Sequence, residues 1–372
     1  MLVCAQCAKV YMEGGLDRCP EDDSPLYEVG EAAPGAVALA PGVTVADKFV
    51  LERELPRRGG AGRTWIAHQT ALRRDVELRI LPKDCVRGPA DEARFRREVA
   101  TWGRLRSDHL ARLFDSGFAP DGSPYMALEI IEGGLASDRL RNAGALPWDD
   151  WQVVVEHALE GLQAAHEAGV LHRDISPDAL VIGVRPNGSP HVRLTGFGLA
   201  KLLAGGDEDP TAITATGLFI GNPAYMAPEW MMKGVVGPQT DLFALGITLY
   251  ELACGVRPVR VTNNSEALAA YVTGKPTPLK THRPDTPAPF GRWIEKLFNF
   301  DPEKRFASAR EALDAFAVAT GPGPESEPTP TPTPTGGAIR AVPPGRRLPM
   351  DRVLWVVAAI AVGALSAWAL SL

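Results

Sequence analysis

The sequence predicts an α+β fold in which a small β-rich lobe is followed by a larger helical lobe. Between residues 47 and about 140, short runs rich in β-branched and aromatic residues surround one expected helix at 91–105. Helical patterns then dominate from 149 to 320. Two lobes of different secondary structure predict a ligand cleft between them. The strands expected in the first lobe cover 49–55, 64–69, 76–81 and 125–131.

The composition is that of an ordinary globular protein. Of the 372 residues, 45% are hydrophobic and 23% are charged, which excludes wholesale disorder, a collagen-like chain and a polytopic membrane protein. The formal charge of −6 gives no sign of a basic footprint and argues against a nucleic-acid partner. Five cysteines are too few for a disulfide scaffold, and three of them fall within the first 19 residues. They indicate a local site in a reducing compartment.

One strongly hydrophobic segment lies at the C-terminal end. Residues 353–372 carry no charge, and as a helix they would span about 30 Å, the thickness of the hydrocarbon core of a bilayer. We therefore expect a single membrane anchor at 350–372, because a buried helix usually keeps a polar stripe. Basic residues before it and a tryptophan near each end favour a cell inner-membrane protein whose main domain is cytoplasmic. These flanking residues are Arg346, Arg347, Arg352, Trp355 and Trp368.

Composition also divides the chain before the anchor. Residues 321–349 contain nine prolines and are expected to form an extended polyproline II stalk of up to about 90 Å. A linker rich in Ala, Gly and Pro at 31–43 separates a cysteine-containing segment, 1–30, from the two-lobed domain, 44–320. The expected order is therefore cysteine segment, linker, domain, stalk and anchor.

The N-terminal segment has the residue spacing of a zinc site. Cys4 and Cys7 are separated by two residues, and Cys19 is followed at the same spacing by Asp22. Zinc accepts Cys sulfur and Asp oxygen in tetrahedral sites, so we expect these four ligands, with Asp23 or water as alternatives for the fourth. The segment resembles the short zinc ribbons of bacterial proteins, and metal binding would supply its folding free energy. A redox Cys-x-x-Cys motif or a disordered tail is the alternative, but a thioredoxin-like strand–helix context is not seen.

Several motifs of the central domain occur in a recognisable order. They are Glu98 in the expected helix, His172-Arg173-Asp174, Ala227-Pro228-Glu229, Asp241 at the start of an apolar helix, and Arg305. Together they resemble the bacterial eukaryotic-like (Hanks-type) serine/threonine protein kinases, over nearly all of 44–320. The resemblance implies a bilobal kinase fold in which His172, Arg173 and Asp241 are structural and Arg305 pairs with Glu229. It also puts Asp174 at the position of the catalytic base.

The positions that hold magnesium in this family are changed. By resemblance, the aspartate of the Asp-Phe-Gly motif is Gly196, and the asparagine of the catalytic loop is Ala179. Neither side chain offers the oxygen ligand that a hard divalent cation needs. Because magnesium neutralises the triphosphate during phosphoryl transfer, the two losses argue against Mg-ATP as a cofactor.

The expected nucleotide cleft departs from the family at further positions. Arg79 replaces the strand lysine; it keeps the charge and is expected to pair with Glu98, although its planar fork is not equivalent to an ammonium group. Glu77 replaces a small alanine that lines the adenine pocket, where a carboxylate would be desolvated. The glycine-rich loop starts with arginine but retains Gly59, Gly60 and Gly62.

Two more substitutions and the hinge complete the expected site. Ser176 replaces the catalytic-loop lysine, and Asn222 replaces the threonine that braces Asp174. The hinge between the lobes is expected at 128–131, where adenine would bind the main chain of Glu129 and Ile131. Adenine recognition of this kind does not depend on a metal.

We interpret the domain as a pseudokinase, a membrane-tethered signalling scaffold or regulator. Its expected partner is a protein, such as an active kinase or the substrate of one. The first alternative is an active or weakly active ATP-dependent serine/threonine kinase that uses Asp174 as base with a rearranged metal site. The second is a metal-free sensor of a nucleotide or another small molecule.

Overall fold

The computed structural model describes residues 2–4, 10–11, 18–20, 26–28, 39–56, 62–86, 88–185, 188–197, 222–261, 267–273 and 275–320. Residues 1–323 form one compact unit. Within the described ranges, no helix is both long and apolar enough to cross a membrane. The predicted stalk, 321–349, and anchor, 350–372, lie outside these ranges.

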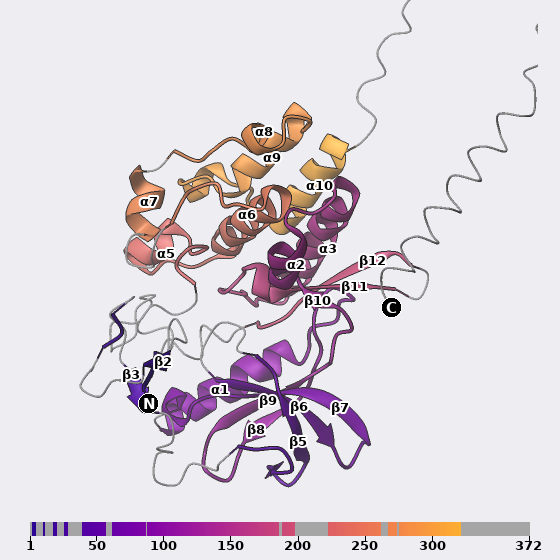
Figure 1. Cartoon of the computed structure of the whole chain (residues 1–372), viewed down its shortest axis with the longest axis vertical. Helices are drawn as coiled ribbons and strands as arrows, with labels where there is room; N and C mark the ends of the chain where they lie inside the picture. Colours follow the sequence, from indigo (N-terminus) through magenta and orange to yellow (C-terminus); the bar gives the residue numbers. More distant parts are fainter. Residues whose placement is uncertain are drawn as a thin grey trace, which may run out of the picture. The chain divides into compact units, whose positions relative to one another are not determined.

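The first lobe is an antiparallel sheet with the strand order β4-β5-β6-β7-β9-β8 (Figure 1). Its strands are β4 (Thr44–Val45), β5 (Phe49–Glu54), β6 (Arg63–Gln69), β7 (Arg74–Ile80), β8 (Leu113–Phe118) and β9 (Pro124–Leu128). Helix α1 (Pro89–Trp102) begins with two acidic residues in its first turn, which suit the positive end of the helix dipole. The four expected strands and the expected helix are confirmed, with ends shifted by a few residues. Strands β4 and β8 were not expected, because β4 is short and β8 contains Asp, Ser and Gly.

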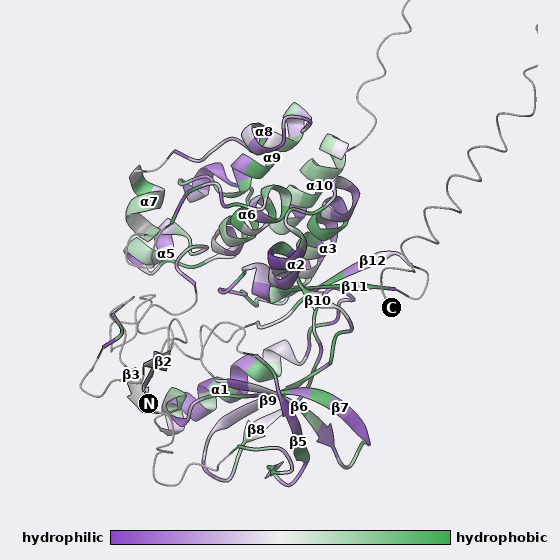
Figure 2. Cartoon of the chain, in the orientation of Figure 1, coloured by the Kyte–Doolittle hydropathy of each residue, from purple (hydrophilic) through white to green (hydrophobic). Residues whose placement is uncertain are grey.

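The second lobe is built around two long helices. Helix α3 (Trp148–Glu167) packs against α6 (Pro238–Cys254), which is buried along most of its length. The Trp151 indole donates to the Leu249 carbonyl at 2.8 Å, so the contact between these helices is both apolar and hydrogen-bonded. Shorter elements surround this pair (Figure 1), and in Figure 2 they carry both hydrophobic and hydrophilic residues. They are α2 (Ala136–Ala143), α5 (Pro228–Lys233), α7 (Ala267–Thr273), α8 (Leu279–His282), α9 (Ala288–Leu297) and α10 (Ala309–Thr320).

A small second sheet positions the segments that matter for function. Strands β10 (Gly134–Leu135), β11 (Leu180–Val184) and β12 (Pro190–Leu194) pair in the order β10-β11-β12. The sequence predicted that helices dominate from 149 to 320, and none of these three strands was expected. Strands of two to five residues are too short to produce a clear alternating pattern. The catalytic loop, 172–179, precedes β11 and Gly196 follows β12, so one hairpin brings the two altered metal positions together.

The N-terminal segment contains a three-stranded antiparallel sheet. Its strands are β1 (Leu2–Cys4), β2 (Val10–Tyr11) and β3 (Leu26–Glu28), in the order β2-β1-β3. Cys4 ends β1 and Cys19 is buried. Cys7 and Asp22 lie outside the described residues, so the zinc site stays a prediction.

Candidate active site

The catalytic loop is held by a buried carboxylate at the start of α6. Asp241 is 1% exposed and accepts the main-chain N–H groups of His172 and Arg173, at 2.8 and 2.7 Å. His166 Nε2 contacts the same carboxylate from α3 at 2.8 Å. Burial acts to raise the pKa of Asp241, but these hydrogen bonds and the neighbouring imidazoles lower it below its ordinary value. They also hold Arg173 in a left-handed backbone conformation, with φ of +67°.

His172 links the catalytic loop to the segment after β12. Its Nδ1 accepts the main-chain N–H of Asp174 at 3.3 Å, so Nε2 carries the proton and donates to the Thr195 carbonyl at 3.0 Å. Burial lowers the pKa of His172 and favours this neutral form. The imidazole packs on Phe197, with ring centroids 4.4 Å apart, and Phe197 in turn faces Trp102 of α1 at 6.3 Å. His172 is therefore a structural residue.

Burial dominates the electrostatics of Asp174. Burial raises the pKa of its carboxyl to about 6, and the charge of Asp178 adds to this rise. A main-chain hydrogen bond from Asn222 and the positive charge of Arg79 act in the opposite direction. The side-chain oxygen of Asn222 does not serve Asp174, because it accepts the N–H of Ala224 at 3.1 Å. The threonine brace of the family is thus replaced here by a main-chain contact.

Neither metal position of the family presents an oxygen-bearing side chain. Ala179 is 6% exposed and lies in the 3-10 helix η2 (Pro177–Ala179), where its carbonyl accepts the N–H of Thr195 at 2.9 Å. Gly196 has φ of +89°, and a Cβ built on it would lie 3.6 Å from Nη1 of Arg79. The residues present therefore do not fit a magnesium ion held as in the family. In place of a metal ligand, the Gly196 position faces a guanidinium group.

Arg79 and Glu77 form a buried ion pair in β7. They are two residues apart on a strand, which puts both side chains on the same face of the sheet. Arg79 Nη2 lies 3.2 Å from Glu77 Oε1, and the two residues are 7% and 8% exposed. Arg79 Nε is also buried and has no hydrogen-bond partner within the described part of the chain. The expected pairing of Arg79 with Glu98 is wrong, because the carboxylate that Arg79 reaches is the nearer one on its own strand.

The remaining expected cleft residues are only partly described. Gly59 and Gly60 lie outside the described residues, whereas Gly62 has φ of +113°. A Cβ on Gly62 would lie 2.6 Å from the Ile80 carbonyl, so this position requires glycine. At the hinge, the Glu129 N–H donates to the Arg112 carbonyl at 2.9 Å, and Ile131 is half-buried. Recognition of adenine by the main chain at Ile131 stays a prediction.

The Glu129 side chain forms an ion pair with a residue outside the hinge. Its Oε1 lies 2.7 Å from Nη1 of Arg193 on β12, and both side chains are largely buried. This ion pair links the hinge to the small second sheet. It was not foreseen from the sequence.

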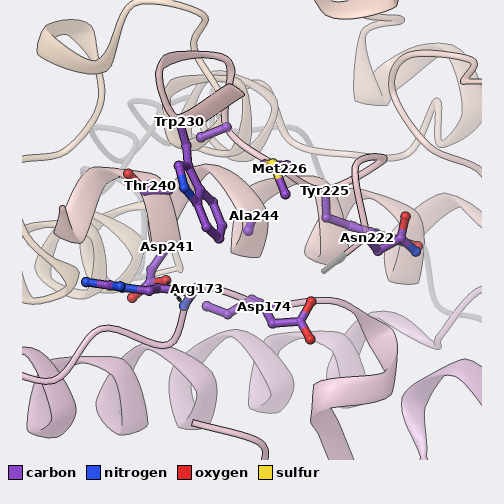
Figure 3. A pocket seen from close by; sticks show the side chains of 11 residues that line it. Arg173, Asp174, Asn222, Tyr225, Met226, Trp230, Thr240, Asp241 and Ala244 are labelled. Carbon is purple, nitrogen blue, oxygen red and sulfur yellow. Dashed lines mark hydrogen bonds between the residues drawn. The ribbon is translucent and has the colours of Figure 1, made fainter. Parts of the chain in front are cut away.

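A pocket lies between the catalytic loop, α5 and α6 (Figure 3). Trp230 and Ala244 give it apolar walls, while Asp174 and Asn222 lie together on another side. Its lining residues are Arg173, Asp174, Ile175, Asn222, Tyr225, Met226, Ala227, Trp230, Thr240, Asp241 and Ala244.

The ion pair expected between Arg305 and Glu229 is present. Two parallel contacts of 2.7 and 2.8 Å join the guanidinium to the carboxylate, and the Arg305 side chain is 0% exposed. Arg305 also donates to the main-chain carbonyls of Gln239, Asn299 and Phe300. The pair ties α5 to the start of α6 and to the segment before α10.

The family model for the protein kinase domain matches residues 58–316 of this chain. The chain belongs to the protein kinase family. The serine/threonine-protein kinase pkn3 of Myxococcus xanthus is 32% identical over 271 residues, which cover 72% of this chain and 49% of the relative. The serine/threonine-protein kinase PknA of Mycobacterium tuberculosis is 30% identical over 308 residues, covering 82% and 68%. The match thus spans about half of pkn3 and about two thirds of PknA.

Solved structures support the same kinase fold. The crystal structure of the Mycobacterium tuberculosis PknI kinase domain aligns with a TM-score of 0.58 and 25% identity. The alignment covers 75% of this chain and 98% of that domain. The bilobal kinase architecture expected from the sequence is therefore confirmed.

Sequence reasoning missed how the cleft is neutralised. The substitutions at 77, 79 and 196 are each evident in the sequence, but their proximity to one another is not. The spacing of 77 and 79 on a strand was a usable signal, since it puts the two charges on one face. The contact between Arg79 and Gly196 had no such signal, because it joins separate parts of the fold.

Proposed function

We propose that this protein is a kinase-like signalling module that does not transfer phosphate. The observation that carries the proposal is the state of the two metal positions. Ala179 and Gly196 offer no side-chain oxygen, and the Gly196 position faces Arg79. Phosphoryl transfer relies on a metal to position and neutralise the triphosphate, and a fixed guanidinium does not bridge phosphate oxygens as magnesium does.

Charge in the cleft also disfavours metal-free ATP as a ligand. Glu77 and Asp174 put two carboxylates close to the guanidinium of Arg79. At pH 7 Asp174 is mostly ionised, because its pKa is about 6. A triphosphate that enters without a divalent cation would therefore meet repulsion that one arginine does not offset. This favours the scaffold over the nucleotide sensor, although uncharged or cationic small molecules are not subject to this repulsion.

The motifs around the domain support a role in recruitment. The Cys4, Cys7, Cys19 and Asp22 spacing favours a zinc ribbon, and the apolar segment 353–372 favours a tether to the inner membrane. We propose that the partner so recruited is a protein, such as an active kinase or its substrate. Zinc content of the purified chain, measured before and after Cys4→Ser, tests the ribbon: zinc in both samples would contradict these ligands.

Phosphate transfer tests the central proposal directly. The purified full-length chain is incubated with radiolabelled ATP, Mg²⁺ or Mn²⁺, and a general acceptor protein, beside an Asp174→Ala variant. We expect no transfer above the level of the variant. Transfer that disappears in Asp174→Ala would overturn the proposal and establish an active kinase.

A further inference from the structure

We infer that the guanidinium of Arg79 takes the place of a divalent cation in the cleft, so that residue 79 keeps metal out even when a ligand is restored at 196. The inference rests on the proposed absence of phosphate transfer and adds its physical cause. It assigns to Arg79 and Glu77 a joint role that the lack of a side-chain oxygen at Gly196 and Ala179 does not by itself imply.

The first support is position. A Cβ at Gly196 would lie in van der Waals contact with Arg79 Nη1, at 3.6 Å. Any longer side chain there would extend toward or alongside a positive charge. A carboxylate introduced at this position would therefore meet a guanidinium before it met an ion from solution.

The second support is charge. The Arg79 charge acts on Asp174, and Arg79 also pairs with Glu77 at 3.2 Å. The positive charge of the guanidinium thus stabilises two carboxylates, as a bridging metal ion would. Arg79 is only 7% exposed. A divalent cation entering the same space would therefore either displace the buried guanidinium or be repelled by its charge.

The third support is how firmly Arg79 is held. Glu77 lies on the same strand and within the same sheet face, so it fixes the guanidinium without help from a ligand. The buried Nε of Arg79 still lacks a hydrogen-bond partner among the described residues. Because Nη2 contacts Glu77, Nη1 is the atom of Arg79 that faces a residue added at 196.

Restoration of the metal site should therefore depend on residue 79 as well as on residue 196. Gly196→Asp alone should create an ion pair with Arg79 and bind no metal. Arg79→Met together with Gly196→Asp should remove the charge of Arg79 from the new carboxylate and from Asp174. Only this double variant should gain affinity for a divalent ion.

Thermal unfolding of the full-length chain, with and without Mn²⁺, tests the inference. We expect no Mn²⁺ effect on the wild type or on Gly196→Asp, and a rise of about 5 °C for the double variant at a hundredfold excess over its Kd. Arg193→Met combined with Gly196→Asp is the matched control. Like Arg79, Arg193 pairs with a carboxylate and has a buried Nε without a partner, but its pair is with Glu129 at the hinge. This control should show no Mn²⁺ effect.

Several outcomes would overturn the inference. One is an equal Mn²⁺ shift in Gly196→Asp with Arg79 intact; another is an equal shift in the Arg193 control. If the double variant does not fold, Arg79→Gln with Gly196→Asp provides a polar replacement with the same expectation, and absence of a Mn²⁺ shift there would also count against it. A Mn²⁺ shift in Gly196→Asp while the wild type transfers no phosphate would remove this inference and leave the proposed function standing. Phosphate transfer by the wild type would instead remove the proposed function.

Discussion

At the scale of single residues, the cleft retains charged side chains, whereas the two metal positions of the family carry Ala179 and Gly196. Asp174 keeps its place on the catalytic loop, yet burial dominates its environment and raises its pKa to about 6. A carboxyl group whose pKa is raised on folding costs stability when it is ionised. Asp174 therefore destabilises the folded state at neutral pH.

Asp174→Asn should stabilise the protein at pH 7. The folded pKa of about 6 lies above the ordinary value of 3.8, so the folded state binds the proton more tightly than the unfolded state. The cost of ionisation is fully present above about pH 6 and disappears as the pH falls below about 4. The gain in the free energy of unfolding at pH 7 should be at most about 3 kcal/mol. Solvent screening at this partly exposed group makes it smaller.

Urea unfolding of wild type and Asp174→Asn, from pH 7 to pH 4, measures this difference. Asp108→Asn is the control, because the Asp108 side chain is 74% exposed and its nearest ion-pair contact, to Arg112, is 4.0 Å long. A gain that is unchanged across this pH range would contradict the assigned cause.

At the scale of elements, the helical lobe is held by buried contacts that do not take part in chemistry. The Arg305–Glu229 pair joins α5 to later segments, and α6 packs closely on α9 through Gly246. These contacts are intact although the cleft is altered. The contacts that hold the helical lobe thus do not depend on the residues at 77, 79, 179 and 196.

Arg305→Ala should destabilise the protein by about 3–5 kcal/mol, because it leaves Glu229 buried without its partner. The matched change is Arg310→Ala, which removes an arginine from an exposed pair with Asp314. That change should cost less than about 1 kcal/mol. Chemical denaturation of both variants compares the two costs, and equal values would refute the structural role of Arg305.

Two glycines in helices should respond to alanine in opposite directions. A Cβ on Gly246 would lie 2.8 Å from the Leu297 Cβ, so Gly246→Ala should cost about 1–3 kcal/mol through overpacking of α6 on α9. A Cβ on Gly291, within α9, would meet nothing within 4 Å. Gly291→Ala should therefore stabilise the helix by about 0.5–1 kcal/mol. Thermal unfolding shows whether each variant raises or lowers the melting temperature. Destabilisation by both variants would contradict the open space assigned to Gly291.

The elements also show where sequence reasoning succeeds and where it stops. The runs at 49–55, 64–69, 76–81 and 125–131 are rich in β-branched and aromatic residues and were found as strands, whereas β11 and β12 lie in a part of the chain where helical patterns dominate and were not found. The motif residues of the site were placed by resemblance. The Arg79–Glu77 pair and the raised pKa of Asp174 depend on burial, which one sequence does not reveal.

At the scale of the whole molecule, the proposal is a kinase-like body attached to a membrane. The apolar segment 353–372 is the feature that favours attachment. Deletion of 353–372 should move the chain from the membrane fraction to the soluble fraction of a cell lysate, after a carbonate wash that removes peripheral proteins. Recovery of the full-length chain in the soluble fraction would contradict the anchor.

Calorimetric titration of the full-length chain with ATP, in the presence and absence of Mg²⁺, tests the central claim most directly. An active serine/threonine kinase, titrated under the same conditions, confirms that the Mg²⁺-dependent signal can be detected. We predict that the wild type gives no saturable heat that depends on Mg²⁺. Saturable Mg²⁺-dependent binding at micromolar Kd would contradict the claim that the cleft no longer holds a metal-bound nucleotide.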